Sequence, residues 1–390
     1  MLHKPGKLRY DIPKAHRPIT LMNTLGKLLS SLVAEDLSFM CEQYALLLDN
    51  HFSSRPGQCT TDMMHLLAHK IKAAWHRHNV AAILFLDVEG AFPNAISAQL
   101  LHNMHMRHVP EEYVLFVDWL LTNRCMQIKF DGFMLDWIDV DNGIVQGDLL
   151  SMILYLFYNA DLMEDMGKME TMVGYMDDVN FYAEGCTFDA AYAKLSDMMT
   201  QEGGGQDWSK LHNSKFKMSK LTLVGFSHWH VQDPARLGKL KAEPWPNLSL
   251  CGTDIKLAES HKFLGVVFDQ ELWWNTQVEQ VIAKATKWTL ASQRLARPAA
   301  SISPQQMCQL YQVVAVPSFT YAADVWFMPI CKESDTGKSS GSVGVVCKLS
   351  TVQRMAMTAI TGVLHTSASD VLEAHANLLP VELLLHRICH

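Results

Sequence analysis

The stretch Gly174-Tyr175-Met176-Asp177-Asp178-Val179 places two adjacent carboxylates between two apolar, aromatic-rich runs. The runs, residues 172–175 and 179–182, favour strands, and the acids between them favour a tight turn. Two neighbouring carboxylates repel each other unless a cation neutralises them. Hard divalent cations such as Mg²⁺ prefer carboxylate oxygens and also bind substrate phosphates. An Asp-Asp pair by itself is more typical of a solvated turn than of a metal site, so other parts of the chain must decide.

A second acid lies upstream, at the end of an unbroken apolar run. Residues 81–86 are all apolar and end in Asp87, a pattern that favours a buried central strand. A carboxylate at the end of a buried strand is costly unless it has a partner or a function. If this strand and the hairpin share one sheet, Asp87, Asp177 and Asp178 converge. Three such carboxylates form a ligand set for two-metal nucleotidyl transfer.

A third segment, residues 143–151, reads Gly-Ile-Val-Gln-Gly-Asp-Leu-Leu-Ser. Its glycines permit a tight loop with close backbone approach. The apolar residues from Leu150 to Leu162 follow helical spacing, and Asp148 stands where a capping or first-turn acid is expected. By itself this segment is equally compatible with an ordinary loop and a core helix.

In this order, the three segments resemble the motif series of reverse transcriptases. Further segments make the chain similar to the non-LTR (LINE-type) retrotransposon branch of that family. They are two fingers segments (residues 16–27 and 52–62), the first palm motif (85–92), the fourth palm motif (208–220), the primer-grip hairpin (261–266) and a segment beyond the thumb (321–326). The resemblance covers nearly the whole chain.

The resemblance implies an α+β fold of the right-hand polymerase type, with fingers, a palm built on an antiparallel sheet and a helical thumb. It also implies RNA-directed DNA polymerase activity, in which dNTPs are joined to the 3′-hydroxyl of a primer. The expected divisions are a fingers region (1–80), a palm that includes the primer-grip hairpin (80–269), a thumb-like helical region (270–331) and a C-terminal helical segment (343–390). The expected partners are an RNA template, a DNA primer and dNTPs.

Residue roles also follow from the resemblance. Asp87, Asp177 and Asp178 would hold two Mg²⁺ ions, with Mn²⁺ as the alternative ion. Phe92 would stack under the incoming sugar and exclude a 2′-hydroxyl, the group that separates RNA from DNA precursors. The remaining substrate contacts are assigned as follows: Arg17 and Lys27 to the triphosphate, Gln146 and Gly147 to the nucleotide and template pocket, and Lys220 to the leaving pyrophosphate.

Charge gives mixed support for nucleic-acid binding. The net charge is −7 and the isoelectric point about 6.2, which does not indicate a nucleic-acid-binding chain. Residues 208–220 contain no acidic residue. Residues 280–300 combine four cationic residues with helical spacing of the apolar ones. The second stretch suits a thumb helix along a phosphate backbone, although a solvated amphipathic face explains it as well. The nucleic-acid contacts predicted for hairpin and thumb are Phe263, Leu264, Gly265, Lys284, Lys287, Arg294 and Arg297.

Three departures from the family pattern leave alternatives open. Many relatives carry Pro where Leu149 stands and Asp where Pro93 stands, and the segment around Gln58 and Cys59 also differs. One alternative is therefore an inactive, truncated retroelement remnant that at most binds nucleic acid. Another is an RNA-dependent RNA polymerase palm, which Phe92 opposes because an RNA synthesiser needs space for the 2′-hydroxyl.

Composition sets the remaining expectations. The nine cysteines are scattered without any Cys-x-x-Cys pair, which favours free thiols in a reducing, intracellular compartment. The family resemblance implies the nucleus and cytoplasm. The longest apolar region, residues 310–330, is interrupted by Pro317 and Asp324, so no membrane partner is expected. The chain opens almost at the first fingers motif, so target cutting by an endonuclease is not expected from it. The sequence does not specify an oligomeric state.

Overall fold

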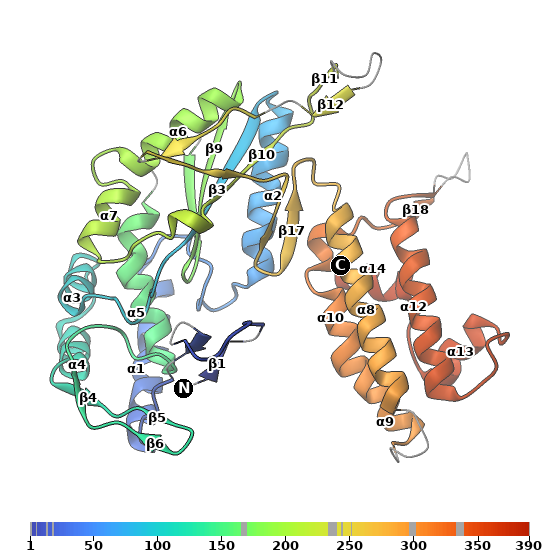
Figure 1. The fold of residues 1–390 in the computed structure, drawn as a ribbon, viewed down its shortest axis with the longest axis horizontal. Helices are drawn as coiled ribbons and strands as arrows, with labels where there is room; N and C mark the ends of the chain where they lie inside the picture. Colours follow the sequence, from blue (N-terminus) through green and yellow to red (C-terminus); the bar gives the residue numbers. More distant parts are fainter. Residues whose placement is uncertain are drawn as a thin grey trace. The chain divides into compact units, whose positions relative to one another are not determined.

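The computed structural model describes residues 2–4, 6–12, 15–17, 19–164, 170–232, 240–242, 245–250, 252–295, 302–332 and 339–389. The chain divides into two compact units, with the boundary between Glu259 and Ser260 (Figure 1). Among the described residues, no helix combines the length and the apolar content that crossing a bilayer requires. The eight cysteines within these ranges are free thiols.

The first unit is built on a five-stranded sheet in the order β15-β10-β3-β9-β8. Its strands are β3 (Val80–Asp87), β8 (Glu170–Tyr175), β9 (Asp178–Gly185), β10 (Thr222–Phe226) and β15 (Lys256–Leu257). Every neighbouring pair is antiparallel except β10 with β15. The apolar run of β3 lies at the centre because both of its edges are paired and both of its faces are covered.

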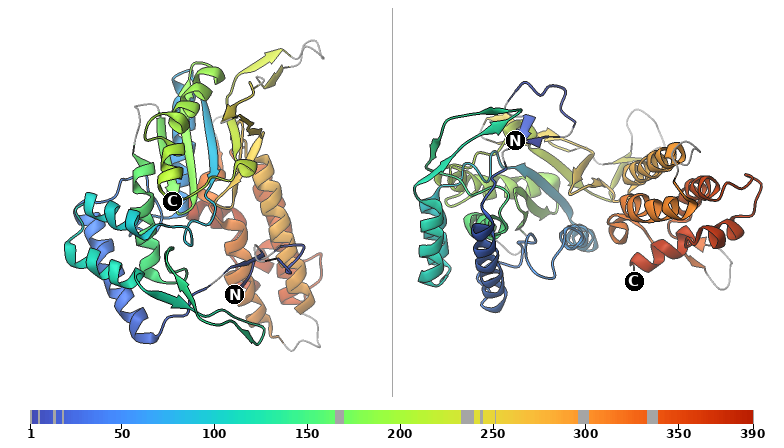
Figure 2. Two further views of the ribbon diagram at one scale, coloured as in Figure 1. Left: turned by 60° about the vertical axis from the view of Figure 1, so that its left-hand side comes forward. Right: turned by 90° about the horizontal axis from the view of Figure 1, so that it is seen from below.

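Helices cover this sheet and gather at one of its ends (Figures 1 and 2). Helices α2 and α6 both pack on β3, while α1, α3 and α4 associate with α5 or with each other. The helical segments are α1 (Thr24–Gln43), α2 (Thr60–His76), α3 (Ser97–Met106), α4 (Glu111–Leu121), α5 (Leu149–Asn159), η2 (Ala160–Met163), α6 (Phe188–Thr200), α7 (Gly205–Leu211) and η3 (Met218–Lys220). Alternate residues of β3, among them Leu84 and Leu86, join the main core with α5 and α6.

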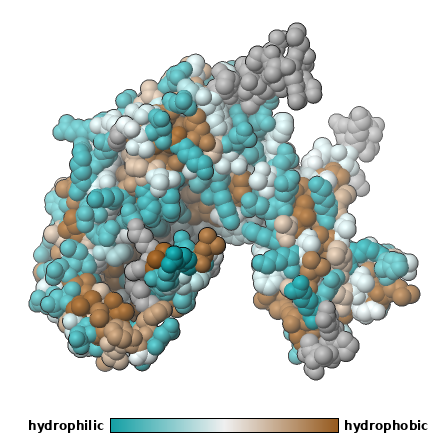
Figure 3. Space-filling model, viewed as in Figure 1, coloured by the Kyte–Doolittle hydropathy of each residue, from teal (hydrophilic) through white to brown (hydrophobic). Residues whose placement is uncertain are grey.

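Short two-stranded ribbons complete the first unit. They are β1 (Leu2–His3) with β2 (His16–Arg17), β4 (Arg124–Met126) with β7 (Ile138–Val140), β5 (Lys129–Phe130) with β6 (Phe133–Met134), β11 (His230–Gln232) with β12 (Leu240–Ala242), and β13 (Ser249–Leu250) with β14 (Thr253–Asp254). Phe133, Met134 and Trp137 of the β4–β7 arm are exposed, and apolar side chains gather at this end of the unit (Figure 3). The arm therefore adds little to the core.

The second unit is mainly helical and begins with a hairpin. The hairpin joins β16 (Ser260–Phe263) to β17 (Val266–Asp269). The Asp269 carboxylate accepts hydrogen bonds from the backbone N–H groups of Trp273 (2.9 Å) and Trp274 (2.6 Å), which fixes the entry to the next helix. The other elements are α8 (Asn275–Leu295), α9 (Pro304–Leu310), η5 (Tyr311–Ala315), α10 (Val316–Thr320), α11 (Ala323–Trp326), β18 (Cys331–Lys332), β19 (Ser339–Ser340), α12 (Val343–Thr361), α13 (Ser369–Ala376) and α14 (Val381–Cys389).

Candidate active site

The tandem acids lie where the sequence predicts them, on a hairpin. Strand β8 ends at Tyr175, strand β9 begins at Asp178, and those two residues are paired across the ladder. The two-residue turn between them holds Met176, whose φ is +56°. Two-residue hairpins favour positive φ at the first turn position because their backbone twist then matches that of the strands. The turn thus presents Asp177 and Asp178 at the end of the sheet.

Asp87 lies directly opposite Asp178. The register between β3 and β9 pairs these two residues at the last position of β3 and the first of β9. Residues opposed in an antiparallel pair have Cα atoms about 5 Å apart and side chains on one face of the sheet. The prediction that Asp87 and the hairpin share one sheet is therefore confirmed. Asp177 immediately precedes Asp178 in the turn, and its charge and that of Asp87 both act on Asp178, so the three carboxylates form an acid cluster.

The electrostatics of the acid cluster show a shortage of positive charge around two of its members. Burial raises the pKa of Asp178 to about 6, and the negative charges of Asp177 and Asp87 add to the shift. Partial burial of its carboxyl also raises the pKa of Asp177, with a smaller contribution from Asp87. Asp177 is exposed as a residue, so we expect water to limit its shift. Both carboxylates would gain from a nearby cation.

Asp87 differs because two lysines already neutralise it. Its Oδ2 accepts hydrogen bonds from the Nζ atoms of Lys220 (2.9 Å) and Lys217 (3.0 Å). Burial alone would raise the pKa of Asp87, but these two bonds outweigh it and hold the pKa below its usual value. The structure thus brings the predicted Lys220 to the acid cluster, and it adds Lys217, which sequence reasoning missed.

Backbone pairing fixes Lys217 beside Asp87. The Lys217 N–H donates to the Asp87 carbonyl (3.0 Å), and the Glu89 N–H donates to the carbonyl of Lys215 (2.8 Å). Between them, Phe216 bridges to Val88 and is buried. The alternation of an exposed lysine, a buried aromatic and a second lysine is a strand signal, and it is the pattern from which Lys217 could have been found.

The donor chemistry of the acid cluster fits a hard divalent cation. Carboxylate oxygens from two adjacent strands converge there, and two of the three acids have raised pKa values. Within the described ranges, no three His, Cys, Asp or Glu side chains are already gathered closely enough to enclose an ion. Asp87 is instead engaged by Lys217 and Lys220. Binding of a metal ion would therefore require Asp87 to exchange ammonium partners for the ion.

A loop next to the acid cluster carries Phe92. Its carbonyl accepts a hydrogen bond from the Ile144 N–H (2.8 Å), and the Gly143 N–H donates to the carbonyl of Ala95 (2.7 Å). Gly143 has φ +95°, and a Cβ there would lie 2.8 Å from the Pro93 carbonyl oxygen, so only glycine fits without a shift. The segments around Phe92 and Gly143 are thus locked together.

Gln146 and Gly147 lie beside the first fingers segment. The Gln146 carbonyl accepts from the Thr20 N–H (2.9 Å), and Gly147, with φ +108°, faces Ile19. Asp148 stands at the N-cap of α5 as predicted, but its side chain makes no capping bond and Oδ2 is buried without a partner among the described residues. The predicted place of Asp148 at the helix entrance is therefore confirmed, although its carboxylate makes no capping bond.

The two predicted triphosphate contacts fall in different surroundings. Arg17, in β2, lies close enough for its charge to lower the pKa of Asp177. Lys27 is exposed on α1, and no contact recorded for the described residues joins it to the acid cluster. Arg17 therefore has structural support that Lys27 lacks, and both roles remain predictions.

The predicted nucleic-acid contacts of the second unit are partly structural. Phe263 is buried and packs edge-on against Phe268 (ring centroids 6.4 Å apart), whereas the Leu264 carbonyl accepts a hydrogen bond from the Tyr321 hydroxyl (2.9 Å). Gly265, with φ +94°, completes the turn. Phe263 is thus placed to support the turn rather than to touch a ligand.

The cationic side chains on α8 differ in their exposure to solvent. Lys284 is half-buried, and burial together with the charge of Lys262 lowers its pKa. Lys287 and Arg294 are exposed. Arg297 lies outside the described residues. These roles in nucleic-acid binding stay predictions.

Comparison with known proteins identifies relatives of this architecture. A family model described as reverse transcriptase (RNA-dependent DNA polymerase) matches residues 2–268. The chain is 25% identical over 339 residues to the probable RNA-directed DNA polymerase from transposon X-element of Drosophila melanogaster, covering 84% of this chain and 34% of that protein. It is 23% identical over 390 residues to the corresponding protein from transposon BS of the same species, covering 98% and 40%.

A third curated relative and a solved structure complete the comparison. The RNA-directed DNA polymerase from mobile element jockey of Drosophila melanogaster is 22% identical over 332 residues, covering 84% of this chain and 34% of that protein. The chain thus spans about a third of the length of such relatives. Telomerase from Candida albicans, in complex with a TWJ fragment of telomeric RNA, aligns with a TM-score of 0.48 at 9% identity, over 91% of this chain and 59% of that one. That likeness is too distant to support an argument about the site.

These matches confirm the predicted family and fold class. The family model covers the fingers and palm segments on which the resemblance rests, and the relatives are polymerases of mobile elements. The α+β right-hand polymerase fold agrees with the five-stranded sheet and its covering helices. The boundaries predicted for fingers, palm and thumb remain predictions.

Proposed function

Because this chain belongs to the reverse transcriptase family, we propose that it is the polymerase core of a non-LTR retrotransposon. In this role it copies an RNA template by joining dNTPs to the 3′-hydroxyl of a DNA primer. The relatives named as RNA-directed DNA polymerases of mobile elements support this proposal. Placement in the nucleus and cytoplasm follows only from the resemblance and is part of the same proposal.

The observation that carries the proposal is the register of the sheet. Asp87 lies opposite Asp178, and Asp177 stands next to it at the hairpin turn. Reverse transcriptases use divalent metal ions, and in our proposal these three carboxylates hold two Mg²⁺, or Mn²⁺, ions. Such ions supply activation of the primer 3′-hydroxyl and neutralisation of charge on the leaving pyrophosphate. The sheet supplies the rigid spacing of the ligands.

The lysines at the acid cluster have separate roles in this proposal. The Lys220 side chain is 58% exposed, whereas that of Lys217 is 29% exposed and its backbone is paired with Asp87. Lys220 is therefore freer to leave Asp87 and follow the pyrophosphate, to which it offers a positive charge or a proton. Lys217 holds Asp87 in place. Arg17, close to Asp177, faces the triphosphate from the fingers, with Lys27 in a lesser role.

Selection of the sugar falls to Phe92 and its neighbouring loop. The bond from the Ile144 N–H to the Phe92 carbonyl ties the Phe92 loop to the segment that leads to Gln146 and Gly147, which in our proposal border the nucleotide and template. A ring against C2′ of the incoming sugar leaves no room for an extra oxygen. Hence dNTPs are preferred over rNTPs, a preference that argues against the alternative of an RNA-synthesising palm.

Contacts with the nucleic-acid backbone belong to the second unit. Lys287 and Arg294 extend from α8 into solvent, where phosphates can reach them. Lys284 adds a half-buried charge near Lys262. The turn at Leu264 and Gly265, supported by Phe263, is the proposed primer grip.

A second candidate function is an inactive remnant that binds nucleic acid without copying it. The ion pairs of Asp87 with Lys217 and Lys220 favour this candidate, since they occupy a carboxylate that polymerisation requires. Leu149 does not decide the matter. It is 64% exposed at the first position of α5, where Pro and Leu are both tolerated.

Primer extension separates the two candidates. Purified protein is given poly(rA) with an oligo(dT) primer, dTTP and Mg²⁺, beside the Asp177→Asn variant. We expect extension by the wild-type chain and a loss of about 10³-fold or more in the variant, since one ligand of the charge-stabilising site is lost. No extension by the folded wild type would favour the remnant, and equal extension by both proteins would contradict the role of Asp177.

A further inference from the structure

The ring of Phe92 rests on a second aromatic ring. Phe92 stacks on Tyr155 with ring centroids 5.0 Å apart and planes 28° from parallel. Phe92 is partly buried, whereas Tyr155, in the middle of α5, is 0% exposed. Stacked rings resist lateral displacement because they keep a large area of contact. Tyr155 therefore limits how far the Phe92 ring can retreat into the protein.

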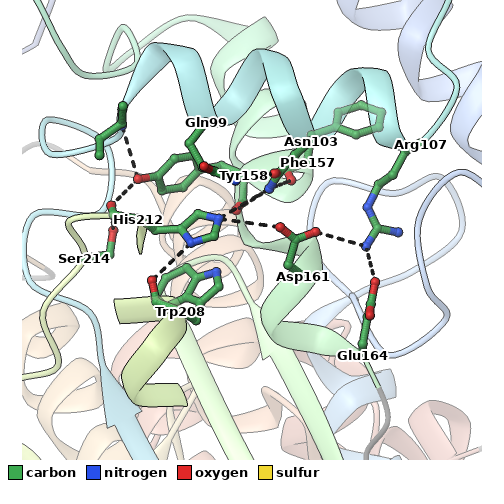
Figure 4. A network of polar contacts seen from close by, with 11 residues as sticks. Gln99, Asn103, Arg107, Phe157, Tyr158, Asp161, Glu164, Trp208, His212 and Ser214 are labelled. Atoms are coloured by element: carbon green, nitrogen blue, oxygen red, sulfur yellow. Dashed lines mark hydrogen bonds and ion pairs between the residues drawn. The ribbon is translucent and has the colours of Figure 1, made fainter. Parts of the chain in front are cut away.

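Tyr155 is itself held by a row of rings anchored in a polar network. The row comprises Phe92, Tyr155, Tyr158, His212 and Trp208, and its rings are joined in that order. The Tyr158 hydroxyl donates to the His212 carbonyl and accepts from the N–H of Ile96. Figure 4 shows this anchored end, where His212 also lies between the Trp208 carbonyl and the Asn103 amide. The row thus runs from a fixed interior to the ring of Phe92.

The backbone around Phe92 leaves side-chain movement as its main freedom. Its carbonyl is bonded to Ile144, and the neighbouring Ala95 carbonyl is bonded to Gly143. A shift of the whole loop would break these bonds. The position of the ring therefore depends on side-chain packing, and Tyr155 supplies the aromatic ring stacked on it.

The ring of Tyr155, rather than its hydroxyl, makes this contact. The hydroxyl is buried and has no hydrogen-bond partner among the described residues. Burial raises the pKa of Tyr155 well above its usual value, and the charge of Asp177 adds to the shift, so the group stays neutral. An unpaired buried hydroxyl costs stability, so removing it should not harm the stack.

We propose that Tyr155 is a positioning residue that sets the sugar selectivity of the polymerase by holding the Phe92 ring in place. The inference rests on the proposed function, in which Phe92 meets the sugar of the incoming nucleotide. With a smaller side chain at position 155 the Phe92 ring gains room to tilt inward. The space it leaves admits the 2′-oxygen of an rNTP.

Four variants separate the effect of the Tyr155 ring from that of its hydroxyl, from general destabilisation and from the effect of the Phe92 ring itself. Tyr155→Leu removes the stack, and Tyr155→Phe keeps the ring without the hydroxyl. Tyr192→Leu is the matched control, because Tyr192 on α6 is 3% exposed, its hydroxyl also lacks a hydrogen-bond partner within the described ranges, and its ring packs against Phe188. Phe92→Val reports directly on the ring that meets the sugar.

The measurement is the ratio of kcat/KM for a dNTP to that for the matching rNTP on a primed RNA template. We expect the ratio to fall about three- to tenfold in Tyr155→Leu, mainly through a lower KM for the rNTP, since the stacking contribution is lost. Tyr155→Phe and Tyr192→Leu should keep the wild-type ratio. An unchanged ratio in Tyr155→Leu, with selectivity lost in Phe92→Val, overturns the inference alone. An unchanged ratio in Phe92→Val overturns the proposed role of Phe92 itself.

Hydrogen exchange gives a readout that does not need catalysis. The amides of Gly143 and Ile144 bond to the Phe92 loop and report its opening. Their exchange should stay at the wild-type rate in Tyr155→Leu, and in Tyr155→Met if the leucine variant fails to fold, because the proposal moves the Phe92 ring while the loop keeps its backbone bonds. Faster exchange in the leucine or methionine variant, but not in Tyr155→Phe or Tyr192→Leu, would show that Tyr155 holds the whole loop, which contradicts a role confined to the Phe92 ring.

Discussion

The acid cluster and the Phe92–Tyr155 stack lie close together in the chain's first unit, yet they are held by opposite means. Backbone register places Asp87 against Asp178, where burial, with a further contribution from the charges of Asp177 and Asp87, raises the pKa of Asp178 to about 6. Ring packing places Phe92 on Tyr155 without any charge. The acid cluster should therefore respond to metal ions and pH, whereas the stack should respond to side-chain volume.

The largest effect is expected at the acid cluster. Asp178→Asn should reduce primer extension by about 10²–10³-fold, because a ligand at the site of charge development is lost. The same change removes a buried like charge, so the metal-free thermal midpoint should stay level or rise. Extension and thermal unfolding in EDTA are measured side by side. A variant that loses its fold along with its activity would show that Asp178 is structural.

At the Phe92–Tyr155 stack, the volume of the side chains should have the largest effect. Phe92→Val should raise the incorporation of an rNTP relative to that of the matching dNTP by about tenfold or more. The discrimination is steric, and the smaller side chain leaves room for the one additional oxygen of the rNTP. Single-nucleotide incorporation with each triphosphate gives the ratio. Selectivity equal to that of the wild type would remove Phe92 from sugar recognition.

A smaller effect is expected at Lys217, which competes with metal ions for Asp87. Lys217→Gln should lower the metal-free thermal midpoint, yet tighten Mn²⁺ binding by about two- to fivefold, in keeping with a half-exposed ion pair. Lys215→Gln is the control, because Lys215 is exposed in the same segment and makes no recorded contact with Asp87. Identical Mn²⁺ affinities in the two variants would contradict competition.

The smallest effect is a change of stability with pH in EDTA. Asp178 has a folded-state pKa of about 6, above its usual value of 3.8. The folded protein then binds more protons than the unfolded chain between these values, so stability falls as pH rises from about 4 to 6. Asp87, with a lowered pKa, contributes in the opposite sense at lower pH. Asp178→Asn should flatten the fall between pH 4 and 6, as thermal midpoints across that range would reveal.

The acid cluster could be predicted from local patterns because each of its parts belongs to a short, continuous stretch of sequence. The apolar stretch before Asp87 and the aromatic runs around Asp177 specify two strands, and a single pairing joins them. Lys217 and Tyr155 escaped prediction because their partners are distant in the chain. Asp87 lies 130 residues from Lys217, so the alternation around Lys217 could predict a strand but not which acid the lysine would meet.

Side-chain direction at two further positions, Phe263 and Asp148, could not be predicted from the sequence either. Phe263 belongs to a motif associated with nucleic acid. The alternation of side chains along its strand, however, directs the Phe263 ring into the interior of the second unit. Asp148 has the residue type and position of a cap, yet its side chain does not accept an amide hydrogen. Residue type and position identify a helix entrance, but side-chain direction is decided by packing.

Binding of Mn²⁺, followed by electron paramagnetic resonance, tests the acid cluster most directly. Free Mn²⁺ gives a signal that disappears on binding, so affinity is read without any need for catalysis. We expect the wild-type chain to bind Mn²⁺ more tightly when dNTP is present, and Asp87→Asn to bind at least about tenfold more weakly, as expected for loss of one carboxylate ligand. Equal binding by both proteins would mean that Asp87, Asp177 and Asp178 do not share a metal ion.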